Sequence, residues 1–336
     1  MCFIQGVVDL KSEILRFLKN AEGEFVSGQE LSESLGVSRT SIWKHINQLK
    51  EEGYEIESIS RKGYKLKSAP DKLDREEIGP LLSTEFIGRE IVYLDTVDST
   101  NEEIKRRADR SREGLVVISE EQSVGKGRLG RNWTSRKGAG IYMSILLKPD
   151  IYPQDAPKIT QVAAAAVVKG LKESGVDAKI KWPNDIILKE KKVAGILTEM
   201  TGELMRVEYI TLGIGINVNN GIEDFPEEIA NKASSLKLEE KKEFERKKIA
   251  SAVLNNFEKL YSDFLERGSI SVSIEICKAN SILLGKEVRV ISRKSEMLRK
   301  AVDINEDGEL VVEDGDGNRE SVFSGEVSIR GIHGYV

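Results

Sequence analysis

Cysteine and histidine are scarce in this sequence of 336 residues. The two cysteines, Cys2 and Cys277, and the two histidines, His45 and His333, lie far apart, without partners at metal-ligand spacing. A structural zinc site or a Cys–His nucleophile needs such partners. We therefore expect no metal-binding residues, and we expect any chemistry to rely on Lys, Arg, Asp, Asn and backbone amides.

Long hydrophobic runs are also missing. No run approaches the roughly 18 apolar residues of a membrane-spanning helix, and residues 1–10 lack the basic start of a secretory signal. We expect a cytoplasmic protein that does not bind membranes, with 39% hydrophobic and 32% charged residues, a balance that can bury a core. The net charge of -5 gives no general attraction to nucleic acid, so DNA binding would need a local basic face.

Changes in pattern divide the chain into three predicted domains of an α+β protein. Short helical patterns and a hairpin come first, and Pro70 then marks a hinge because proline interrupts regular structure. A mixed α/β region follows, and from Gly285 onward short strands alternate with Asp-Gly turns. The predicted domains are residues 1–68, 69–284 and 285–336.

The first domain has the pattern of a helix-turn-helix followed by a hairpin. Apolar residues at helical spacing mark the inward faces of two helices: Leu10, Ile14, Leu18, Ile42, Ile46 and Leu49. Between them, Ser27 and Glu30 form a capping box for a helix that stops at Gly36, and Ser38 can cap the next one. Residues 54–59 alternate as a strand, and residues 64–67 return after a basic turn. This order predicts a winged helix-turn-helix.

In such a module the second helix of the motif enters the DNA major groove and basic wing residues contact phosphates. The residues predicted to contact DNA are Ser38, Arg39, Thr40, Ser41, Trp43, Lys44, Asn47, Arg61 and Lys62. The alternative is a small helical packing domain whose charges are merely solvated. For Trp43 the alternative is a partly buried place in the core.

A basic, glycine-rich loop follows a predicted strand at residues 115–119. Within residues 125–131 the glycines allow the backbone to approach a ligand, and Lys126, Arg128 and Arg131 add positive charge. This combination suits a phosphate or a carboxylate. The loop matches neither a Walker loop nor a dinucleotide-binding loop, and taken alone it is equally compatible with a flexible, solvated loop.

Two further segments of the second domain have an unusual pattern. A strand at residues 178–181 leads into the tetrapeptide Trp-Pro-Asn-Asp at 182–185, and a hairpin turn at 189–191 precedes a strand at 192–197. The strand at 210–218 contains Gly213 and Gly215, which weaken a strand and indicate that something packs close to its backbone. A later helix carries an apolar stripe that belongs to the core: Ile249, Val253, Phe257, Leu260 and Phe264.

Together these segments resemble the biotin protein ligase family, and with the winged module the chain resembles its bifunctional type, which is also the biotin operon repressor. The resemblance rests on residues 98–101, 125–131 with Trp133, 181–185, 192–197 and 213–217, which occur in the family's order. It implies a central mixed α/β domain like that of biotin and lipoate ligases and an SH3-like β-barrel at the carboxyl end.

The resemblance implies a reaction in two steps. Biotin's carboxylate attacks the α-phosphate of ATP, with Mg²⁺, to give biotinyl-5'-AMP and pyrophosphate, and a carrier lysine then takes the biotinyl group. Because two anions meet in the first step, positive charge must offset their repulsion. The catalytic residues implied are Lys192, Arg128, Asp185 and Lys126. Asp185 either accepts the proton of the carrier lysine or orients Lys181 or Asn184.

The same resemblance assigns two sets of binding residues. The biotin-binding set is Ser99, Thr100, Asn101, Gln122, Lys126, Gly127, Arg128, Lys192 and Gly195. The nucleotide-binding set is Arg128, Arg131, Trp133, Asn184 and Asn217. Lys126 stands where some members carry arginine, so it keeps the charge but loses the two-pronged hydrogen bonding that helps retain the adenylate.

The implied partners are the biotin carboxyl carrier protein of acetyl-CoA carboxylase or another biotin-dependent carboxylase, operator DNA, and a second copy of the chain in a homodimer with biotinyl-5'-AMP. Two alternatives compete with this interpretation. A regulator that only senses biotin or a nucleotide would form no biotinylated carrier. A lipoate ligase or octanoyl transferase shares the fold, but the polar residues 99–101 and the 182–185 motif favour biotin.

Overall fold

The computed structural model describes residues 10–203, 205–291, 296–323 and 328–331. The chain forms two compact units, Met1–Lys72 and Leu73–Val336. Within the described residues, no helix is both long enough and apolar enough to cross a membrane.

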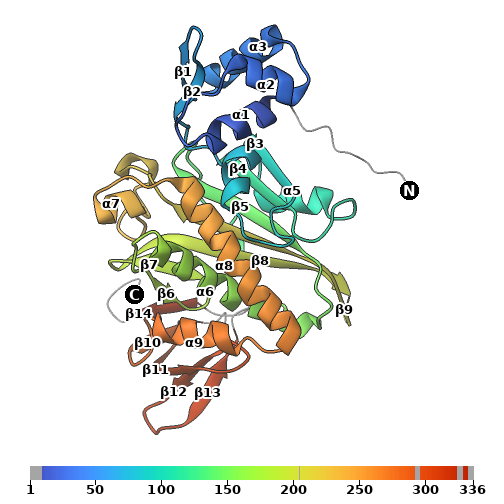
Figure 1. The fold of residues 1–336 in the computed structure, drawn as a ribbon. Coiled ribbons are helices and arrows are strands. Elements are labelled where there is room, and N and C mark those ends of the chain that lie inside the picture. Colours follow the sequence, from blue (N-terminus) through green and yellow to red (C-terminus); the bar gives the residue numbers. More distant parts are fainter. Residues whose placement is uncertain (1–9, 204, 292–295, 324–327, 332–336) are drawn as a thin grey trace. The chain divides into compact units, whose positions relative to one another are not determined.

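The first unit consists of three helices and a hairpin (Figure 1). These elements are α1 (Leu10–Asn20), α2 (Gly28–Leu35), α3 (Arg39–Glu51), β1 (Glu55–Ile59) and β2 (Gly63–Ser68). Both predicted serine caps are confirmed, because Ser27 Oγ accepts from the Glu30 amide at 3.0 Å and Ser38 Oγ from the Ser41 amide at 3.2 Å. The predicted inward-facing residues of α1 and α3 lie in one buried cluster, apart from Leu10, which is partly buried against it.

The wing is fixed to the segment between α1 and α2. Val26 and Tyr64 exchange two backbone hydrogen bonds of 2.9 Å. Gly63 begins β2 at a φ of +109°, and a Cβ there would lie 2.1 Å from the Val26 carbonyl oxygen. Only glycine fits this close approach, so the basic turn of residues 60–62 projects from a rigid base.

The second unit is built around a seven-stranded sheet among its described residues, in the order β3-β4-β5-β9-β8-β7-β6. The strands are β3 (Ile91–Val97), β4 (Val116–Gln122), β5 (Gly140–Leu147), β6 (Lys179–Lys181), β7 (Asp185–Leu188), β8 (Lys191–Glu203) and β9 (Arg206–Asn217). Only the β3–β4 pair is parallel, and the other pairs are antiparallel. The described part of the unit is therefore mixed α/β, with a largely antiparallel sheet.

Helices cover both faces of this sheet. The helices are α4 (Arg75–Ile78), α5 (Thr100–Arg107), α6 (Lys158–Glu173), α7 (Leu236–Glu240), α8 (Arg246–Arg267) and α9 (Ser271–Ala279), with short 3₁₀ turns at Gly79–Leu81, Arg128–Gly130, Pro153–Asp155 and Ile222–Asp224. Side chains alternate along each strand, so Val116 and Ile118 belong to the core under α6 and α8, whereas Val117 packs with Ile104 of α5.

The carboxyl-terminal strands form a second sheet, in the order β13-β12-β11-β10-β14. They are β10 (Glu287–Ile291), β11 (Glu296–Ile304), β12 (Leu310–Glu313), β13 (Arg319–Val322) and β14 (Ser328–Gly331). The two predicted Asp-Gly turns connect β11 to β12 and β12 to β13. The predicted closing strand is only partly described, because residues 324–327 lie outside the described residues. Val288, Ile304 and Val312 belong to the same hydrophobic core as α6 and α8.

A buried ion pair joins α8 to the main sheet. Arg246 Nη1 lies 2.7 Å from Glu120 Oε2, and both side chains are almost fully buried. Tyr93 donates to the same carboxylate at 2.9 Å, and Arg246 also donates to the Gly140 carbonyl at 3.1 Å. This network is fully hydrogen-bonded, as buried charges require.

We predict that Arg246→Met destabilises the second unit by about 3–5 kcal/mol, because the Glu120 carboxylate would stay buried without its cation. Lys248→Met is the control, since the ion pair of Lys248 with Glu245 is exposed and such pairs contribute about 0–1 kcal/mol. Urea denaturation measures both changes. Equal losses in the two variants would contradict the assignment.

Candidate functional site

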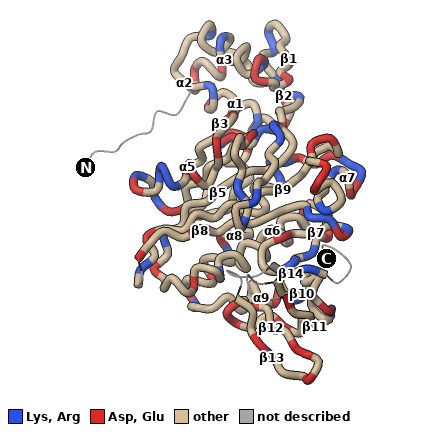
Figure 2. Tube along the Cα trace, turned by 180° about the vertical axis from the view of Figure 1, so that it is seen from behind, with Lys and Arg blue, Asp and Glu red and all other residues tan. Residues whose placement is uncertain are grey.

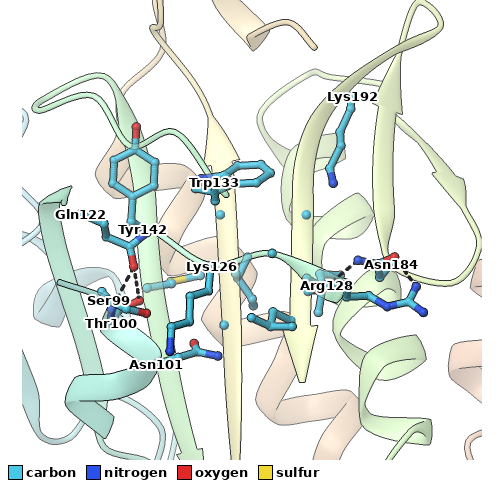
Figure 3. A pocket seen from close by; sticks show the side chains of 18 residues that line it. Ser99, Thr100, Asn101, Gln122, Lys126, Arg128, Trp133, Tyr142, Asn184 and Lys192 are labelled. Carbon is cyan, nitrogen blue, oxygen red and sulfur yellow. Dashed lines mark hydrogen bonds between the residues drawn. The ribbon is translucent and has the colours of Figure 1, made fainter. Parts of the chain in front are cut away.

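A pocket lies over strands β5, β9 and β8, beside the first turn of α5 (Figure 3). Its lining residues are Ser99, Thr100, Asn101, Gln122, Lys126, Gly127, Arg128, Trp133, Tyr142, Met143, Asn184, Lys192, Gly195, Ile196, Leu197, Gly213, Ile214 and Gly215. This set contains every residue predicted for the biotin end, together with Trp133 and Asn184 from the nucleotide set. The structure thus brings together segments that are more than 100 residues apart in sequence.

Glycines make the floor of this pocket. On β9, Ile214 and Ile216 belong to the core under the helices, so the intervening Gly213 and Gly215 face the pocket. A Cβ on Gly215 would lie 2.6 Å from the Trp133 ring, and one on Gly213 would lie 2.3 Å from Asn101 Oδ1. The predicted close packing against this strand is confirmed, and the packed groups are side chains of the chain itself.

Gly195 extends the floor onto β8, where it pairs directly with Gly215. A Cβ on Gly195 would lie 3.0 Å from the Trp133 ring and 3.1 Å from Lys192 Nζ. The indole therefore lies over two adjacent strands that lack side chains there. Trp133 Nε1 is buried and has no hydrogen-bond partner in the described part of the chain.

Neutral polar groups line the α5 end of the pocket. The backbone amide and Oγ1 of Thr100 both donate to Gln122 Oε1, at 2.9 and 3.1 Å, and Gln122 Nε2 donates to Ser135 Oγ at 2.9 Å. Ser144 Oγ lies 2.7 Å from Thr100 Oγ1 and 2.6 Å from Asn101 Oδ1. Thr100, Asn101, Ser135 and Ser144 are buried and Gln122 is partly buried, so the network fixes which way each amide points.

Charged residues continue from Asn101 to the glycine-rich loop. Asn101 Nδ2 donates to Glu199 at 2.7 Å, and Lys105 bridges Glu199 and Glu102 at 2.9 Å to each. Glu102 in turn lies 2.6 Å from Lys126 Nζ. Lys126 accordingly points from the loop toward α5, as Figure 3 shows.

Sequence reasoning missed Ser144, Tyr142, Glu199 and Glu102. Ser144 pairs with Gly213 across β5 and β9, and Glu199 lies on β8 two alternations beyond Gly195. The two-residue period of β8 could have indicated Glu199. Ser144 depends on the β5–β9 register, which joins residues about 70 positions apart in the sequence and has no local signal.

The opposite end of the pocket is cationic. Lys192 Nζ lies 2.5 Å from Asp185 Oδ1 and 5.3 Å from the centre of the Trp133 ring. Arg128 Nη1 donates to Asn184 Oδ1 at 2.9 Å. Burial lowers the pKa of Arg128 from its ordinary value, and the charge of Asp185 opposes this shift; an arginine remains a cation at neutral pH.

The loop of residues 125–133 is closed by its own backbone. Gly127 N donates to Arg131 O at 2.7 Å, and Trp133 N donates to Gly125 O at 2.8 Å. A Cβ on Gly125 would lie 2.3 Å from the Trp133 carbonyl oxygen, so this closure requires glycine. Leu129, at the tip, is 62% exposed and has a φ of 57°.

Two members of the predicted nucleotide set lie outside this pocket. Arg131 lines an adjoining groove that shares Lys126, Arg128 and Asn184 with the pocket. Asn217 is buried at the end of β9, where its Nδ2 donates to the Ser234 carbonyl at 3.0 Å. Among the described residues, no group of three or more His, Cys, Asp or Glu side chains has the arrangement of a metal site.

The surface predicted to contact DNA lies on α3 and the wing of the first unit. Trp43 is 59% exposed, so it is not a core aromatic. A groove runs between α3 and the wing, and its lining includes Arg39, Trp43, Asn47 and Arg61. Figure 2 shows basic residues on α3 and at the turn between β1 and β2.

Lys181 lies under the cationic end of the pocket and is only 3% exposed. Burial lowers its pKa from 10.5 to about 8, and the carboxylate of Asp185 opposes this shift. The folded chain therefore releases this proton at lower pH than the unfolded chain does. The buried charge of Lys181 therefore destabilises the folded chain. This loss of stability is complete below about pH 8 and disappears as the pH rises to 10.5.

We predict that the unfolding free energy of the wild-type chain rises with pH from about 8 to 10.5 relative to that of Lys181→Met, by up to about 1.4 kcal/mol per pH unit. Denaturation of both proteins over this range provides the comparison, in which other titrating groups cancel. A constant difference would show that Lys181 titrates at its ordinary pKa.

Comparison with known proteins places three matches along the chain. Residues 11–65 match an HTH domain, residues 93–217 the biotin/lipoate A/B protein ligase family, and residues 283–330 the biotin protein ligase C terminal domain. Their order confirms the predicted fold class: an N-terminal helix-turn-helix, a central ligase-like domain and a C-terminal domain.

Similar proteins span almost the whole chain. The bifunctional ligase/repressor BirA of Bacillus subtilis is 38% identical over 95% of this chain and 98% of its own length, and that of Escherichia coli is 30% identical over 92% and 94%. The biotin protein ligase of Aquifex aeolicus in complex with biotin and ATP is a structural neighbour, with a TM-score of 0.63 and 30% identity over 72% of this chain and 99% of that one. The chain belongs to the biotin protein ligase family, in its bifunctional ligase/repressor form.

Proposed function

We propose that this chain activates biotin with ATP to biotinyl-5'-AMP and then transfers the biotinyl group to a lysine of a carboxyl carrier protein. One observation carries the proposal. A single glycine-floored pocket has neutral hydrogen-bonding groups and Lys126 at one end and the cations Arg128 and Lys192 at the other. A substrate with a neutral polar head and a carboxylate tail matches that arrangement.

The neutral end would bind the ureido ring of biotin. Ser99, Thr100, Asn101 and Gln122 are all close to this end, and hydroxyl and amide groups can both donate to and accept from a neutral ring. Glu199 and Ser144 hold the amide of Asn101, so its donor and acceptor are fixed before biotin arrives. Gly127 and Gly195 would lie against the ligand because they present no side chain.

The cationic end would bring the biotin carboxylate and the α-phosphate together. Arg128 and Lys192 come from two separate segments of this end, and Lys126 would join them by turning from Glu102 toward the anions. Together these cations would offset the repulsion between the anions. Asp185 lies 2.5 Å from Lys192, and this ion pair supports a role in holding Lys192 in place. The same carboxylate would alternatively accept the proton of the carrier lysine in the second step.

The nucleotide would lie on the side of Arg128, Arg131, Trp133 and Asn184. The Trp133 indole is the flat group available to cover the adenine. Asn217, whose amide is engaged by the Ser234 carbonyl, would support this side by holding the end of β9. Mg²⁺ would enter as the complex with ATP, because this ion is usually held by nucleotide phosphates and one or two carboxylates.

The winged unit would bind operator DNA, with α3 in the major groove and Arg61 and Lys62 at phosphates. We propose that biotinyl-5'-AMP promotes a homodimer that binds a two-part operator. We also propose that the chain acts in the cytoplasm. Its proposed domains are residues 1–68, 69–284 and 285–336. The carrier would be that of acetyl-CoA carboxylase or of another biotin-dependent carboxylase.

The direct test is to incubate the purified chain with biotin, MgATP and an apo carrier domain, with and without excess lipoate. Biotinylated carrier that lipoate does not suppress supports the proposal. No modified carrier would indicate a mere sensor of biotin, and lipoylated carrier would indicate a lipoate ligase.

For the first step, we predict that Arg128→Ala keeps the fold but releases the adenylate roughly tenfold to a hundredfold faster, the range for one lost charged contact of about 1.5–3 kcal/mol. Released adenylate would then biotinylate unrelated lysines. Arg136→Ala is the control, because Arg136 is exposed and pairs with Asp224 away from the pocket. An unchanged dissociation rate in Arg128→Ala would refute its role.

For DNA, we predict that biotin and ATP together increase binding to genomic fragments that the ligand-loaded chain selects. We also predict that Lys62→Ala lowers the slope of log binding constant against log salt concentration by about one, the contribution of one phosphate contact. Lys172→Ala, an exposed change in the other unit, should have no effect. Gel-shift titrations at several salt concentrations measure both. Binding that ignores biotin and ATP would remove the link between the two activities.

A further inference from the structure

The turn between β11 and β12 reaches from the carboxyl-terminal sheet to the 182–185 motif of the main sheet. Asn305 fixes the shape of this turn, because its Oδ1 accepts from the amides of Asp307 and Glu309 at 3.1 and 2.9 Å. Asp307 lies 2.8 Å from Lys158 Nζ at the start of α6. The turn therefore meets the main sheet as a preformed, rigid piece.

The central contact is a buried hydrogen bond. Trp182 Nε1 donates to the Gly308 carbonyl at 2.8 Å, and the Trp182 side chain is only 1% exposed. An indole N–H buried at this depth needs an acceptor, and a residue distant in the sequence supplies it. Residues 305–309 thus hold the first residue of the motif.

Gly308 also packs against Gln161, which binds Pro183, the second residue of the motif. The φ of Gly308 is +81°, and a Cβ there would lie 2.8 Å from Gln161 Cγ. Gln161 Nε2 donates to the Pro183 carbonyl at 3.0 Å, and its side chain is 2% exposed. Gly308 therefore contacts Trp182 directly and Pro183 through Gln161.

The next residue of the motif faces the pocket. Asn184 Nδ2 donates to the Ile196 carbonyl at 2.9 Å, which fixes the amide so that Oδ1 accepts from Arg128 Nη1 at 2.9 Å. Figure 3 shows Asn184 and Arg128 side by side at the edge of the pocket. A continuous path of contacts thus leads from Gly308 to a cation of the site.

We propose that the 305–309 turn is a positioning element for the reaction: Gly308 and Trp182 set Asn184 so that it holds Arg128 over the pocket. None of the described residues of the carboxyl-terminal sheet lines the pocket of Figure 3, so the turn acts on the pocket indirectly, through this path. The inference rests on the proposed ligase function. It assigns the larger effect to the nucleotide side, because Arg128 is shared by both substrates whereas the neutral groups of the biotin end are held by α5, β5 and β8.

The test compares Gly308→Ala with Gly317→Ala. Both glycines lie in hairpin turns of the same sheet at a φ above +80°, but a Cβ on Gly317 would meet no atom within 4 Å. The two variants therefore share the backbone cost of positive φ, and only Gly308→Ala presses on Gln161. In a pyrophosphate-release assay we expect Gly308→Ala to raise KM for ATP roughly fivefold to thirtyfold. KM for biotin should rise by less, because Arg128 is only one of several groups that would bind biotin, and Gly317→Ala should resemble wild type.

Trp182→Phe provides a second variant if Gly308→Ala does not fold. It keeps a large ring but removes the N–H, so we expect the same selective rise in KM for ATP. A third measurement needs no activity. Amide hydrogen exchange of residues 125–131 should become faster in Gly308→Ala and Trp182→Phe than in wild type, and should stay unchanged in Gly317→Ala.

Equal changes in KM for ATP and for biotin, or hydrogen exchange in residues 125–131 that is the same in all four proteins, would overturn the inference. If the wild-type chain itself forms no pyrophosphate, the proposed function fails. The exchange measurement would still show whether the turn controls the loop, so the two failures are distinguishable.

Discussion

The site depends on the absence of side chains at Gly195, Gly213 and Gly215. These residues lie on adjacent strands, and Gly195 pairs directly with Gly215. A methyl group at Gly213 would overlap Asn101, and one at Gly215 would overlap Trp133. The bare backbone lets an amide from α5 and an indole from the loop reach the same area of sheet. A polar end and an aromatic cover then share one small pocket.

The charges of the site are arranged in compensated pairs. Lys126 lies with Glu102, and Lys192 lies with Asp185. Carboxylates hold each lysine at the pocket, and an anionic ligand would take over part of each interaction. Partly buried charges of one sign repel strongly in a low-dielectric site, so the acidic partners allow several cations to gather there.

The elements that hold this site could be predicted to different extents. The helix-turn-helix followed from local signals, because Ser27 and Ser38 begin helices through their side-chain oxygens and Gly36 ends one through its backbone amide. The glycine-rich loop and the glycines of β9 were visible as exceptions to ordinary strand composition. The roles of individual residues came from the resemblance to a family and not from these patterns.

Contacts between distant segments could not be predicted in this way. Ser144 reaches the polar end only through the β5–β9 register, and the Glu120–Arg246 ion pair joins residues 126 positions apart. Trp182 was visible as part of a motif, but its acceptor, Gly308, lies another 126 positions away. Such pairs have no local signal, because they depend on how layers pack and not on the propensity of either segment.

The central claim is that one cationic, glycine-floored pocket brings a carboxylate and a nucleotide phosphate into reaction. Rapid mixing of the chain with biotin and MgATP, followed by measurement of released pyrophosphate, tests it most directly. The account predicts about one pyrophosphate per chain in the first turnover, only when both substrates are present. No pyrophosphate with both substrates, or the same amount without biotin, would contradict it.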